Sequence, residues 1–291
     1  MNNKVAILYI ALGRYSIFWK EFYLSAEKLL ENADKEYFIW TDNPANEIYA
    51  SDNARVHIIT AQKKGWPYDT LLRFEMFVAI EKQLETFDYI YFFNANFQFF
   101  NPTDLTEIAP RAWDNGLVAG IHPGILTTKI TSPDQHSYER RPQSTAYIPF
   151  GSGQHYVCGA FNGGTAAAYL EMCKTLSTNI RTDLDNEIIA CVDDESHLNA
   201  YLANRNFLLC GAAYGFPEAK LKWMPKKYST MVKIISRQKN NPKYGGERWL
   251  RGQTDHKMLN IPGLKATGRI IAGLLFWWSK PIRQKIRSYC G

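Results

Sequence analysis

The sequence predicts an α/β fold in which a mostly parallel, Rossmann-like sheet is flanked by helices. The first observation is an alternating strand–helix order over the first hundred residues, which favours parallel strands joined by crossover helices. The second is a composition that is 46% hydrophobic over 291 residues, enough for a sizeable core. The third is the aromatic run within residues 87–100, which is typical of a strand buried in a sheet.

The individual elements of the first hundred residues follow from hydrophobic periodicity. We expect strands at 5–10, 36–41, 55–59 and 88–93, and helices at 15–31 and 70–84. The strand at 36–41 ends at Asp42, Asn43 and Pro44, which form a turn sequence. The helix at 70–84 carries its Leu, Phe, Met and Ile residues at helical spacing.

The middle third of the chain changes in character. Residues 122–165 are rich in Gly, Pro, Ser, Gln and Tyr, which predicts loops and short strands that build a second site. Helices are expected at 164–176, 183–191 and 196–203, and residues 222–251 are basic and irregular. We therefore expect one domain over residues 1–251, followed by a distinct tail at 252–291.

Charge and cysteine content limit the function classes. Lys and Arg number 34 against 28 acidic residues, a net charge of +6 that suits a phosphate-bearing ligand or an anionic surface. No basic stripe or nucleic-acid motif is present, so no nucleic acid is expected as a partner. Five cysteines without paired spacing predict reduced thiols and a cytoplasmic protein. Because CxxC and HExxH patterns are missing, we expect no zinc site.

The tail has the composition of an interfacial segment. No run of about 18 apolar residues occurs, so no transmembrane helix is expected, and the first apolar run is too short for a signal peptide. The apolar stretch 270–278 ends in Trp277 and Trp278 and is flanked by Lys and Arg. This pattern leaves two alternatives, a helix docked on the domain or an anchor on an anionic membrane surface. The second would make the protein peripheral on the inner membrane face.

Asn94 and Asn96 are the most informative pair of residues in the chain. They directly follow the aromatic strand, point to the same side, and lie where parallel sheets bind ligands. Many nucleotide-sugar transferases carry Asp-x-Asp at this place, and its carboxylates hold a divalent metal on the donor diphosphate. Amides are neutral and poor ligands for a hard cation. A transferase with this pair has to bind the diphosphate without the usual metal.

Further motifs match one family in order and spacing. They are the Asn-Ala-Asn frame within 87–99, Ile121-His-Pro-Gly124, and the stretches 137–149, 159–164 and 194–199. The runs Tyr138-Glu-Arg-Arg-Pro-Gln-Ser144 and Asp194-Glu-Ser-His-Leu-Asn199 are the specific ones. Together, over about residues 5–251, they resemble glycosyltransferase family 6, the retaining family of the histo-blood-group A and B transferases and the α1,3-galactosyltransferase. The resemblance implies a GT-A type fold, and the chain resembles the bacterial Asn-x-Asn members thought to work without metal.

The resemblance assigns the catalytic and acceptor residues. Glu195 matches the residue that stabilises oxocarbenium character or forms a covalent glycosyl intermediate. Asp194 matches a residue that binds hydroxyls of the donor sugar. His122 and Ser137 match residues that line the acceptor site. From the residues alone, the acids at 193–195 also suit N-terminal capping of the helix at 196–203.

The resemblance also assigns residues to the nucleotide and diphosphate of the donor. Tyr15 and the backbone at Ile10 and Ala11 match a uridine pocket, and Arg73 matches an arginine near the donor sugar. Lys239 and Arg251 are expected on the diphosphate, where their charge would replace that of a metal. They lie in the cation-rich segment 237–251, which Gly245 and Gly246 would let fold over the site; a solvated basic tail is the alternative. Asn94 and Asn96 would donate hydrogen bonds to phosphate or ribose.

Three further positions bear on sugar specificity. Cys158 and Ala160 occupy the two positions that set donor choice in the family, and the small Cys158 favours N-acetylgalactosamine (GalNAc) over galactose (Gal). Trp66 would offer an aromatic face to the acceptor, with packing in the core as the alternative. Val192 departs from the Trp that the animal enzymes have near the acceptor.

The resemblance thus implies a retaining α1,3-glycosyltransferase. It would move GalNAc or Gal from UDP-GalNAc or UDP-Gal to a galactose-containing, fucosylated oligosaccharide or glycolipid acceptor, with no divalent metal as cofactor. Three alternatives stay open: a UDP-Gal-specific enzyme, a metal-dependent retaining transferase of another family that uses Asp193 or Asp194, and a non-catalytic glycan-binding module.

Overall fold

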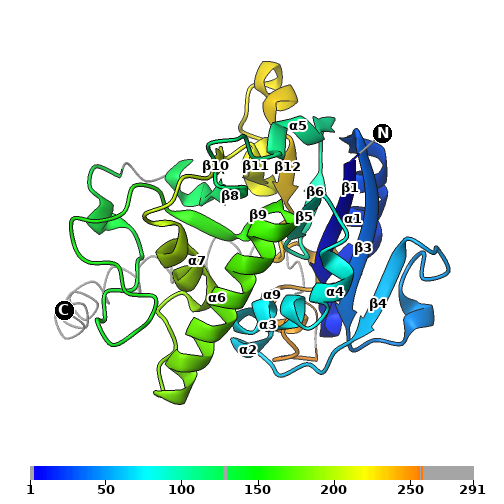
Figure 1. Cartoon of the computed structure of the whole chain (residues 1–291). Helices are drawn as coiled ribbons and strands as arrows, with labels where there is room; N and C mark the ends of the chain where they lie inside the picture. Colours follow the sequence, from blue (N-terminus) through cyan, green and yellow to red (C-terminus); the bar gives the residue numbers. More distant parts are fainter. Residues whose placement is uncertain (1–2, 127–129, 256, 258–291) are drawn as a thin grey trace, which may run out of the picture.

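The centre of the molecule is a seven-stranded sheet in the order β10-β8-β9-β5-β1-β3-β4 (Figure 1). The structure is a computed structural model that describes residues 3–126, 130–255 and 257. The strands are β1 Asn3–Ile10, β3 Ala33–Thr41, β4 Val56–Thr60, β5 Tyr89–Phe93, β8 Leu117–Ile121, β9 Val157–Thr165 and β10 Leu208–Cys210. Neighbouring strands are parallel except where β9 pairs antiparallel with β5 and β8. The predicted α/β fold with a mostly parallel sheet is therefore confirmed.

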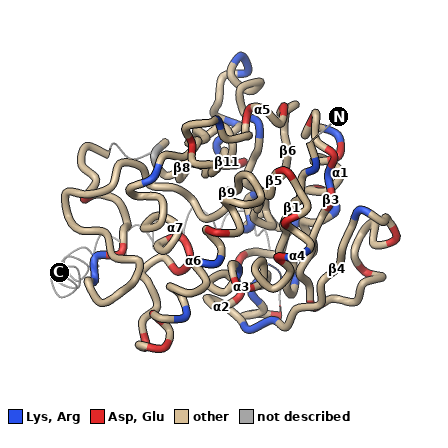
Figure 2. Tube along the Cα trace, viewed as in Figure 1, with Lys and Arg blue, Asp and Glu red and all other residues tan. Residues whose placement is uncertain are grey.

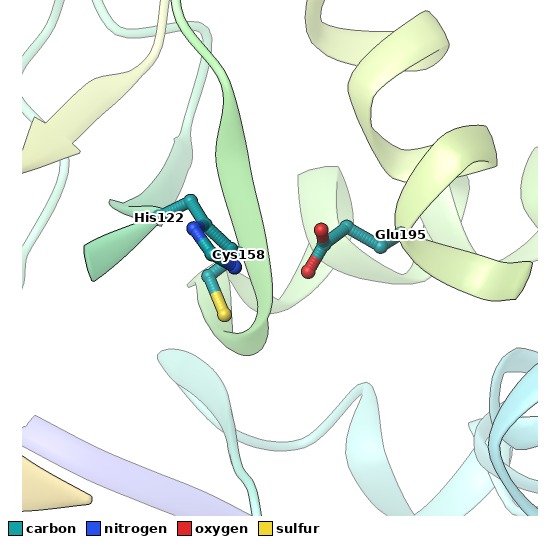
Figure 3. A group of neighbouring side chains, drawn as sticks. All are labelled: His122, Cys158 and Glu195. Carbon is teal, nitrogen blue, oxygen red and sulfur yellow. The ribbon is translucent and has the colours of Figure 1, made fainter. Parts of the chain in front are cut away.

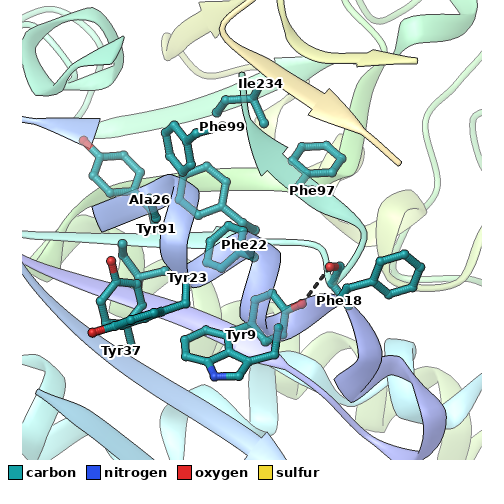
Figure 4. Packing of buried hydrophobic residues seen from close by; sticks show 14 of the residues in the cluster. Tyr9, Phe18, Phe22, Tyr23, Ala26, Tyr37, Tyr91, Phe97, Phe99 and Ile234 are labelled. Atoms are coloured by element: carbon teal, nitrogen blue, oxygen red, sulfur yellow. Dashed lines mark hydrogen bonds between the residues drawn. The ribbon is translucent and has the colours of Figure 1, made fainter. Parts of the chain in front are cut away.

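β1 builds the core on both faces of the sheet because its side chains alternate. Val5, Ile7 and Tyr9 belong to one buried cluster, whereas Ala6 and Leu8 belong to another. Helix α1 (Trp19–Leu29) covers the first face, and α3 (Arg73–Val78), α6 (Ala166–Asp185) and α7 (Asp193–Leu202) contribute to the second. Figure 4 shows the aromatic packing of the first cluster, where the Tyr9 hydroxyl donates to the carbonyl oxygen of Ala95 over 2.7 Å.

Two smaller sheets and several short helices complete the fold. One sheet has the order β11-β12-β6, with β11 Tyr214–Pro217, β12 Ile234–Ser236 and β6 Phe97–Phe99, and the other pairs β2 Leu30–Glu31 with β7 Thr103–Asp104. The short α-helices are α2 Tyr68–Leu71, α4 Glu81–Leu84, α5 Leu105–Ile108, α8 Glu218–Leu221 and α9 Glu247–Leu250. The 3₁₀ helices are η1 Gly13–Phe18, η2 Ala45–Glu47, η3 Pro123–Leu126, η4 Pro133–Gln135, η5 Lys226–Met231 and η6 Pro242–Tyr244.

Several helix boundaries differ from the sequence prediction. The predicted helix at 15–31 begins as the 3₁₀ helix η1 and ends at Leu29, because Leu30 and Glu31 pair with β7. The predicted helix at 70–84 is divided into α2, α3 and α4. The helix expected at 183–191 is wrong: α6 continues to Asp185, and the chain then turns through Glu187, whose φ of 58° is left-handed.

The segment expected to form loops and short strands contains the nine-residue strand β9. Its residues 159, 163 and 164 are glycines, so the composition resembled a loop. Within residues 222–251, β12 pairs with β6, so this part of the chain is more regular than its composition indicates. Of the described residues, no helix combines the length and the apolar character that crossing a bilayer requires. The apolar stretch 270–278 lies outside the described residues.

Gly163 provides a test of this packing, because the neighbouring strand leaves no room for a side chain. A Cβ atom at this position would lie 2.5 Å from the carbonyl oxygen of Ile90 in β5. We expect Gly163→Ala to lower the free energy of unfolding by about 2–3 kcal/mol in urea denaturation. Gly211→Ala is the matched control, since nothing lies within 4 Å of its would-be Cβ, and its change should stay within about 0.5 kcal/mol. Equal effects of the two substitutions would contradict the packing.

Candidate active site

Two cavities adjoin at the carboxyl ends of the central strands. The first has a volume of about 280 Å³ and reaches from Ile10, at the end of β1, to Asn94, just after β5. The second has a volume of about 420 Å³ and lies beside His122, which directly follows β8. Val192 and Glu195 line both cavities. The start of α7 therefore forms a wall that the two cavities share.

The first cavity gathers most of the residues predicted for the donor. Those that line it are Ile10, Tyr15, Arg73, Asn94, Cys158, Ala160, Asp194, Lys239 and Arg251, together with Trp66 and Glu195. Ala11 and Asn96 do not line it. Ala11 is fully buried, its amide donates to the carbonyl of Trp40, and its own carbonyl accepts from the Thr41 hydroxyl.

The second cavity contains His122 and Ser137, the other two residues predicted for the acceptor. Trp66 does not join them, because it lines the first cavity, where the guanidinium of Arg251 lies 4.8 Å from its ring centre. Trp66 is 55% exposed, so the alternative of core packing is wrong. Apart from Glu195, the second cavity is lined by neutral, histidine and aromatic residues.

A buried ion pair fixes the start of α7. The guanidinium of Arg73, on α3, lies 2.9 Å from the Asp194 carboxylate, and both side chains are almost fully buried. Arg73 also donates to the carbonyl oxygens of Gly159 at 2.8 Å and Thr70 at 3.1 Å. Its charge lies over the ring of Phe92 at 4.5 Å. Arg73 therefore joins α7 to α2 and to β9 from a buried position.

The ion pair does not satisfy Asp194 completely, because its Oδ2 has no well-aligned hydrogen-bond donor. Burial raises the pKa of Asp194 to about 7, against the opposing effect of Arg73, and the carboxylates of Glu195 and Asp193 raise it further. The preceding Asp193 has a left-handed φ of 42°, an unfavourable backbone conformation for this residue type. Such strain and such pKa shifts are concentrated at functional sites.

Glu195 points toward β9 rather than back onto its own helix. Its Oε2 accepts the backbone N–H of Gly159 at 2.7 Å, and the residue at the N-cap of α7, Val192, makes no side-chain capping bond. Glu195 therefore does not cap the helix. Acidic and basic residues lie next to each other along the trace around α2, α3 and the start of α7 (Figure 2).

Glu195 also forms a cluster with His122 and Cys158 (Figure 3). One potential ligand atom from each lies within 4.8 Å of the others. Burial and the charge of Glu195 raise the pKa of the Cys158 thiol, so it is neutral. The Nδ1 of His122 accepts the N–H of Gly124 at 3.0 Å, which places the proton of the neutral ring on Nε2. Thiol, imidazole and carboxylate suit zinc rather than the hard cations that bind diphosphates.

The Asn94 and Asn96 side chains are bonded to each other and to the chain. Asn94 Nδ2 donates to Asn96 Oδ1 at 3.0 Å, and Asn96 Nδ2 donates to the carbonyl of Arg237 at 2.8 Å. Of the two asparagines, Asn94 lines the first cavity and Asn96 does not. Asn96 therefore positions the Asn94 side chain through the hydrogen bond between them. Asn96 Oδ1 already accepts from Asn94, and the oxygen that remains on Asn94 is a neutral amide. The pair therefore does not fit a magnesium or manganese ion, which binds through carboxylates.

Besides Arg73, which is paired with Asp194, the described cations that line the first cavity are Lys63, Lys239 and Arg251. Lys63 was missed by the sequence analysis, although its position shortly after a parallel strand is a signal that could have found it. Glu247 holds Arg251 at 2.9 Å and lies 3.9 Å from Lys239. Lys239 also lies 5.4 Å from the ring centre of Tyr15.

The segment that carries Lys239 and Arg251 is folded onto the domain. Tyr244 is fully buried and its ring centre lies 4.4 Å from that of Phe18. Its hydroxyl and the side chains of Lys243 and Arg237 bond to Glu21. The interpretation of a solvated basic tail is therefore wrong for residues 237–251.

A mostly parallel sheet with a cavity of mixed charge at the carboxyl ends of its strands is the arrangement of α/β enzymes that bind their ligands at this edge. The model of glycosyltransferase family 6 matches residues 1–242, and the chain belongs to this family. The chain is 33% identical over 243 residues to the O-antigen biosynthesis glycosyltransferase WbnI of Escherichia coli, covering 83% of this chain and 97% of that protein. The expected family is thus confirmed, and with it a GT-A fold, a sugar donor and a glycan acceptor.

Animal relatives are matched over part of their length. The globoside α-1,3-N-acetylgalactosaminyltransferase 1 of Gallus gallus is 29% identical over 76% of this chain and 64% of its own length. The histo-blood group ABO system transferase 2 of Rattus norvegicus is 28% identical over 69% of this chain and 59% of its own length.

The raised pKa of Asp194 predicts a pH-dependent stability. Because the pKa is about 7 in the folded state and 3.8 is its ordinary value, the folded protein binds the extra proton between these values. The stability that this proton provides is fully present below about pH 4 and is lost as the pH rises through about 7. Relative to Asp194→Asn, the wild type should lose about 2–3 kcal/mol of unfolding free energy between pH 5 and pH 8.

Urea denaturation at each pH measures this difference, with the exposed Asp52→Asn as control. A difference between wild type and Asp194→Asn that stays constant with pH would show that Arg73 keeps Asp194 ionised throughout.

Proposed function

We propose that the protein is a retaining α1,3-glycosyltransferase that moves GalNAc, or Gal, from a UDP-sugar to a galactose-containing, fucosylated acceptor. The observation that carries this proposal is the position of Glu195 on the wall between the two cavities. A donor in the first cavity and an acceptor in the second would meet at this carboxylate. The names of the relatives, which include α-1,3-N-acetylgalactosaminyltransferases and an O-antigen enzyme, support the same reaction class.

Glu195 suits the role of the anionic group in retaining transfer. Such transfer needs a carboxylate on the sugar face opposite the departing diphosphate, where it stabilises oxocarbenium character or forms a glycosyl intermediate. The N–H of Gly159 holds Glu195 Oε2, which orients the carboxylate before substrate binds. Asp194 lies beside it in the first cavity, in position to bind sugar hydroxyls.

Lys63, Lys239 and Arg251 would stabilise the leaving diphosphate. Preorganised positive charge at the place where negative charge develops lowers the barrier of such a step. Glu247, the carboxylate that pairs with Lys239 and Arg251, holds these two cations in place. Tyr15 lies near the end of β1 in the same cavity, in position to stack on a uracil ring. Asn94 and Asn96 do not fit a divalent metal, so we propose that transfer is metal-independent.

The acceptor side is supported by His122 and Ser137. With Nδ1 accepting from Gly124, the Nε2–H of His122 is a donor for an acceptor hydroxyl. Cys158 and Ala160 line the donor cavity. The small Cys158 leaves room for an N-acetyl group and Ala160 takes part of that room back, so we favour GalNAc over Gal as the transferred sugar. The chain would work in the cytoplasm, in the assembly of a bacterial glycan or lipid-linked precursor, with its tail at the inner membrane face.

Two alternative functions fit the geometry of the site less well. A metal-dependent transferase that binds its cation through Asp194 is disfavoured, because Asp194 is already paired with Arg73. A glycan-binding module without activity would need only the second cavity. That function would not explain why Lys63, Lys239 and Arg251 line the first cavity.

Product analysis with UDP-GalNAc and UDP-Gal against 2′-fucosyllactose, with and without EDTA, tests the proposal. We expect an α1,3-linked product whose rate of formation EDTA leaves unchanged. Glu195→Gln should lower kcat at least ~100-fold, because it removes the charge that stabilises the transition state. The exposed Glu171→Gln on α6 is the matched control and should retain full activity. Full activity of Glu195→Gln would contradict a catalytic role for Glu195. Inhibition of the wild type by EDTA would contradict metal-independent transfer.

A carboxylate in place of Asn94 should harm the enzyme rather than rescue a metal site. In Asn94→Asp, the new charge would pair with the cavity cations and repel the diphosphate, so kcat/KM should fall about tenfold, or ~1.4 kcal/mol. Added Mn²⁺ should not restore it. The single variant is the cleaner test, because Asp at position 96 would face the Arg237 carbonyl and disturb folding. Activation of Asn94→Asp by Mn²⁺ above the wild-type rate would refute the reasoning.

A further inference from the structure

A third hollow continues from the second cavity along the surface. It has a volume of about 280 Å³ and shares Gln154 and His155 with the second cavity. Both residues are exposed, and they precede β9, the strand that carries Cys158 into the site. The three hollows therefore follow one another, with Glu195 shared by the first and second and Gln154 and His155 shared by the second and third.

The third hollow has the chemistry of a sugar subsite. Trp113 lines it and is 64% exposed, with the guanidinium of Arg111 5.7 Å from its ring centre, so most of the indole is accessible to a ligand in the hollow. An indole offers an apolar face and an N–H donor, which match the C–H face and the hydroxyls of a pyranose ring. Gln154 and Asn206 add amide donors and acceptors, and Arg205 adds a guanidinium.

The charged groups at this hollow are already held in place. The guanidinium of Arg205 lies 3.9 Å from the ring centre of Tyr201 and donates to its carbonyl oxygen. Asp114 accepts the backbone N–H of Arg111 at 2.8 Å, so its carboxylate is used within the loop. The rest of the lining is Leu202, Ala203, Phe207 and Leu209. Amides and oriented charged groups beside aromatic and aliphatic side chains suit a neutral pyranose, which has hydroxyls at its edge and an apolar C–H face.

We propose that the third hollow is a subsite for a further sugar of an extended neutral oligosaccharide acceptor. The reacting sugar would lie in the second cavity, and the glycan would cross Gln154 and His155 to stack on Trp113. This inference rests on the proposed function, because it takes the second cavity as the acceptor site. It adds that the acceptor is longer than the disaccharide that the second cavity holds.

Acceptor length provides the test. The wild type and Trp113→Ala are compared on the disaccharide Fucα1,2Gal and on a neutral pentasaccharide that ends in this disaccharide. Loss of the stacking ring should raise KM for the pentasaccharide about 3–10-fold, as expected for one aromatic contact, and leave KM for the disaccharide and both kcat values unchanged. Trp113→Phe, which keeps a ring, should restore most of the affinity for the pentasaccharide.

Trp223→Ala is the matched control. Trp223 is 78% exposed and lies between α8 and β12, in the segment that projects at the top of the view in Figure 1, away from α7. Its replacement should change neither KM. Equal KM changes for both acceptors in Trp113→Ala, or the same pentasaccharide effect in Trp223→Ala, would overturn the subsite.

A binding measurement separates this inference from the proposed function. Saturation-transfer NMR with the pentasaccharide should show contacts to its inner sugars in the wild type and their loss in Trp113→Ala. If no sugar is transferred to either acceptor, the proposed function fails, but this NMR comparison still decides the subsite. Contacts confined to the terminal disaccharide would refute it.

Discussion

The geometry of the active site depends on the ion pair between Arg73 and Asp194. It joins α3 to α7, and the bond from Arg73 to the Gly159 carbonyl adds β9 to the same unit. Gly159 then uses its own N–H to hold Glu195. One buried arginine thereby sets the position of the two neighbouring carboxylates and of the strand opposite them. Burying two charges costs desolvation energy, so this pair is better understood as a device for positioning than as a source of stability.

The same constraint explains why the carboxylates differ in chemistry. Asp194 is enclosed and carries a raised pKa, whereas Glu195 reaches into the space between the cavities. The left-handed Asp193 before them directs the first turn of α7 toward β9, at a cost of about 1–3 kcal/mol that the surrounding contacts have to offset. The strained turn, the ion pair and the Gly159 bonds together hold a charged group where two substrates would meet.

Much of this arrangement could be predicted from the sequence. The alternation of Val5, Ile7 and Tyr9 against Ala6 and Leu8 is local, so the strand and its two-sided burial follow from periodicity. The motifs that contain Glu195 and His122 are local as well. β9 could not be predicted, because its glycines are explained only by close contacts with distant segments: Gly163 with β5, Gly164 with Gly116 and the start of β8, and Gly159 with α7. The division of residues between two cavities, which moved Trp66 away from His122, depends on contacts between distant segments.

The attachment of residues 237–251 to η1 and α1 has a consequence for biosynthesis. Arg14 donates to the carbonyl of Trp249, 235 positions further along the chain, and Phe18 packs on Tyr244. Contacts of such separation close late in folding, because a long loop loses much entropy when its ends meet. On the ribosome, the sheet can form while Lys239 and Arg251, which complete the first cavity, are still unsynthesised. A nascent or truncated chain would therefore hold an assembled core with an incomplete first cavity, which is closed only when residues 237–251 dock on η1 and α1.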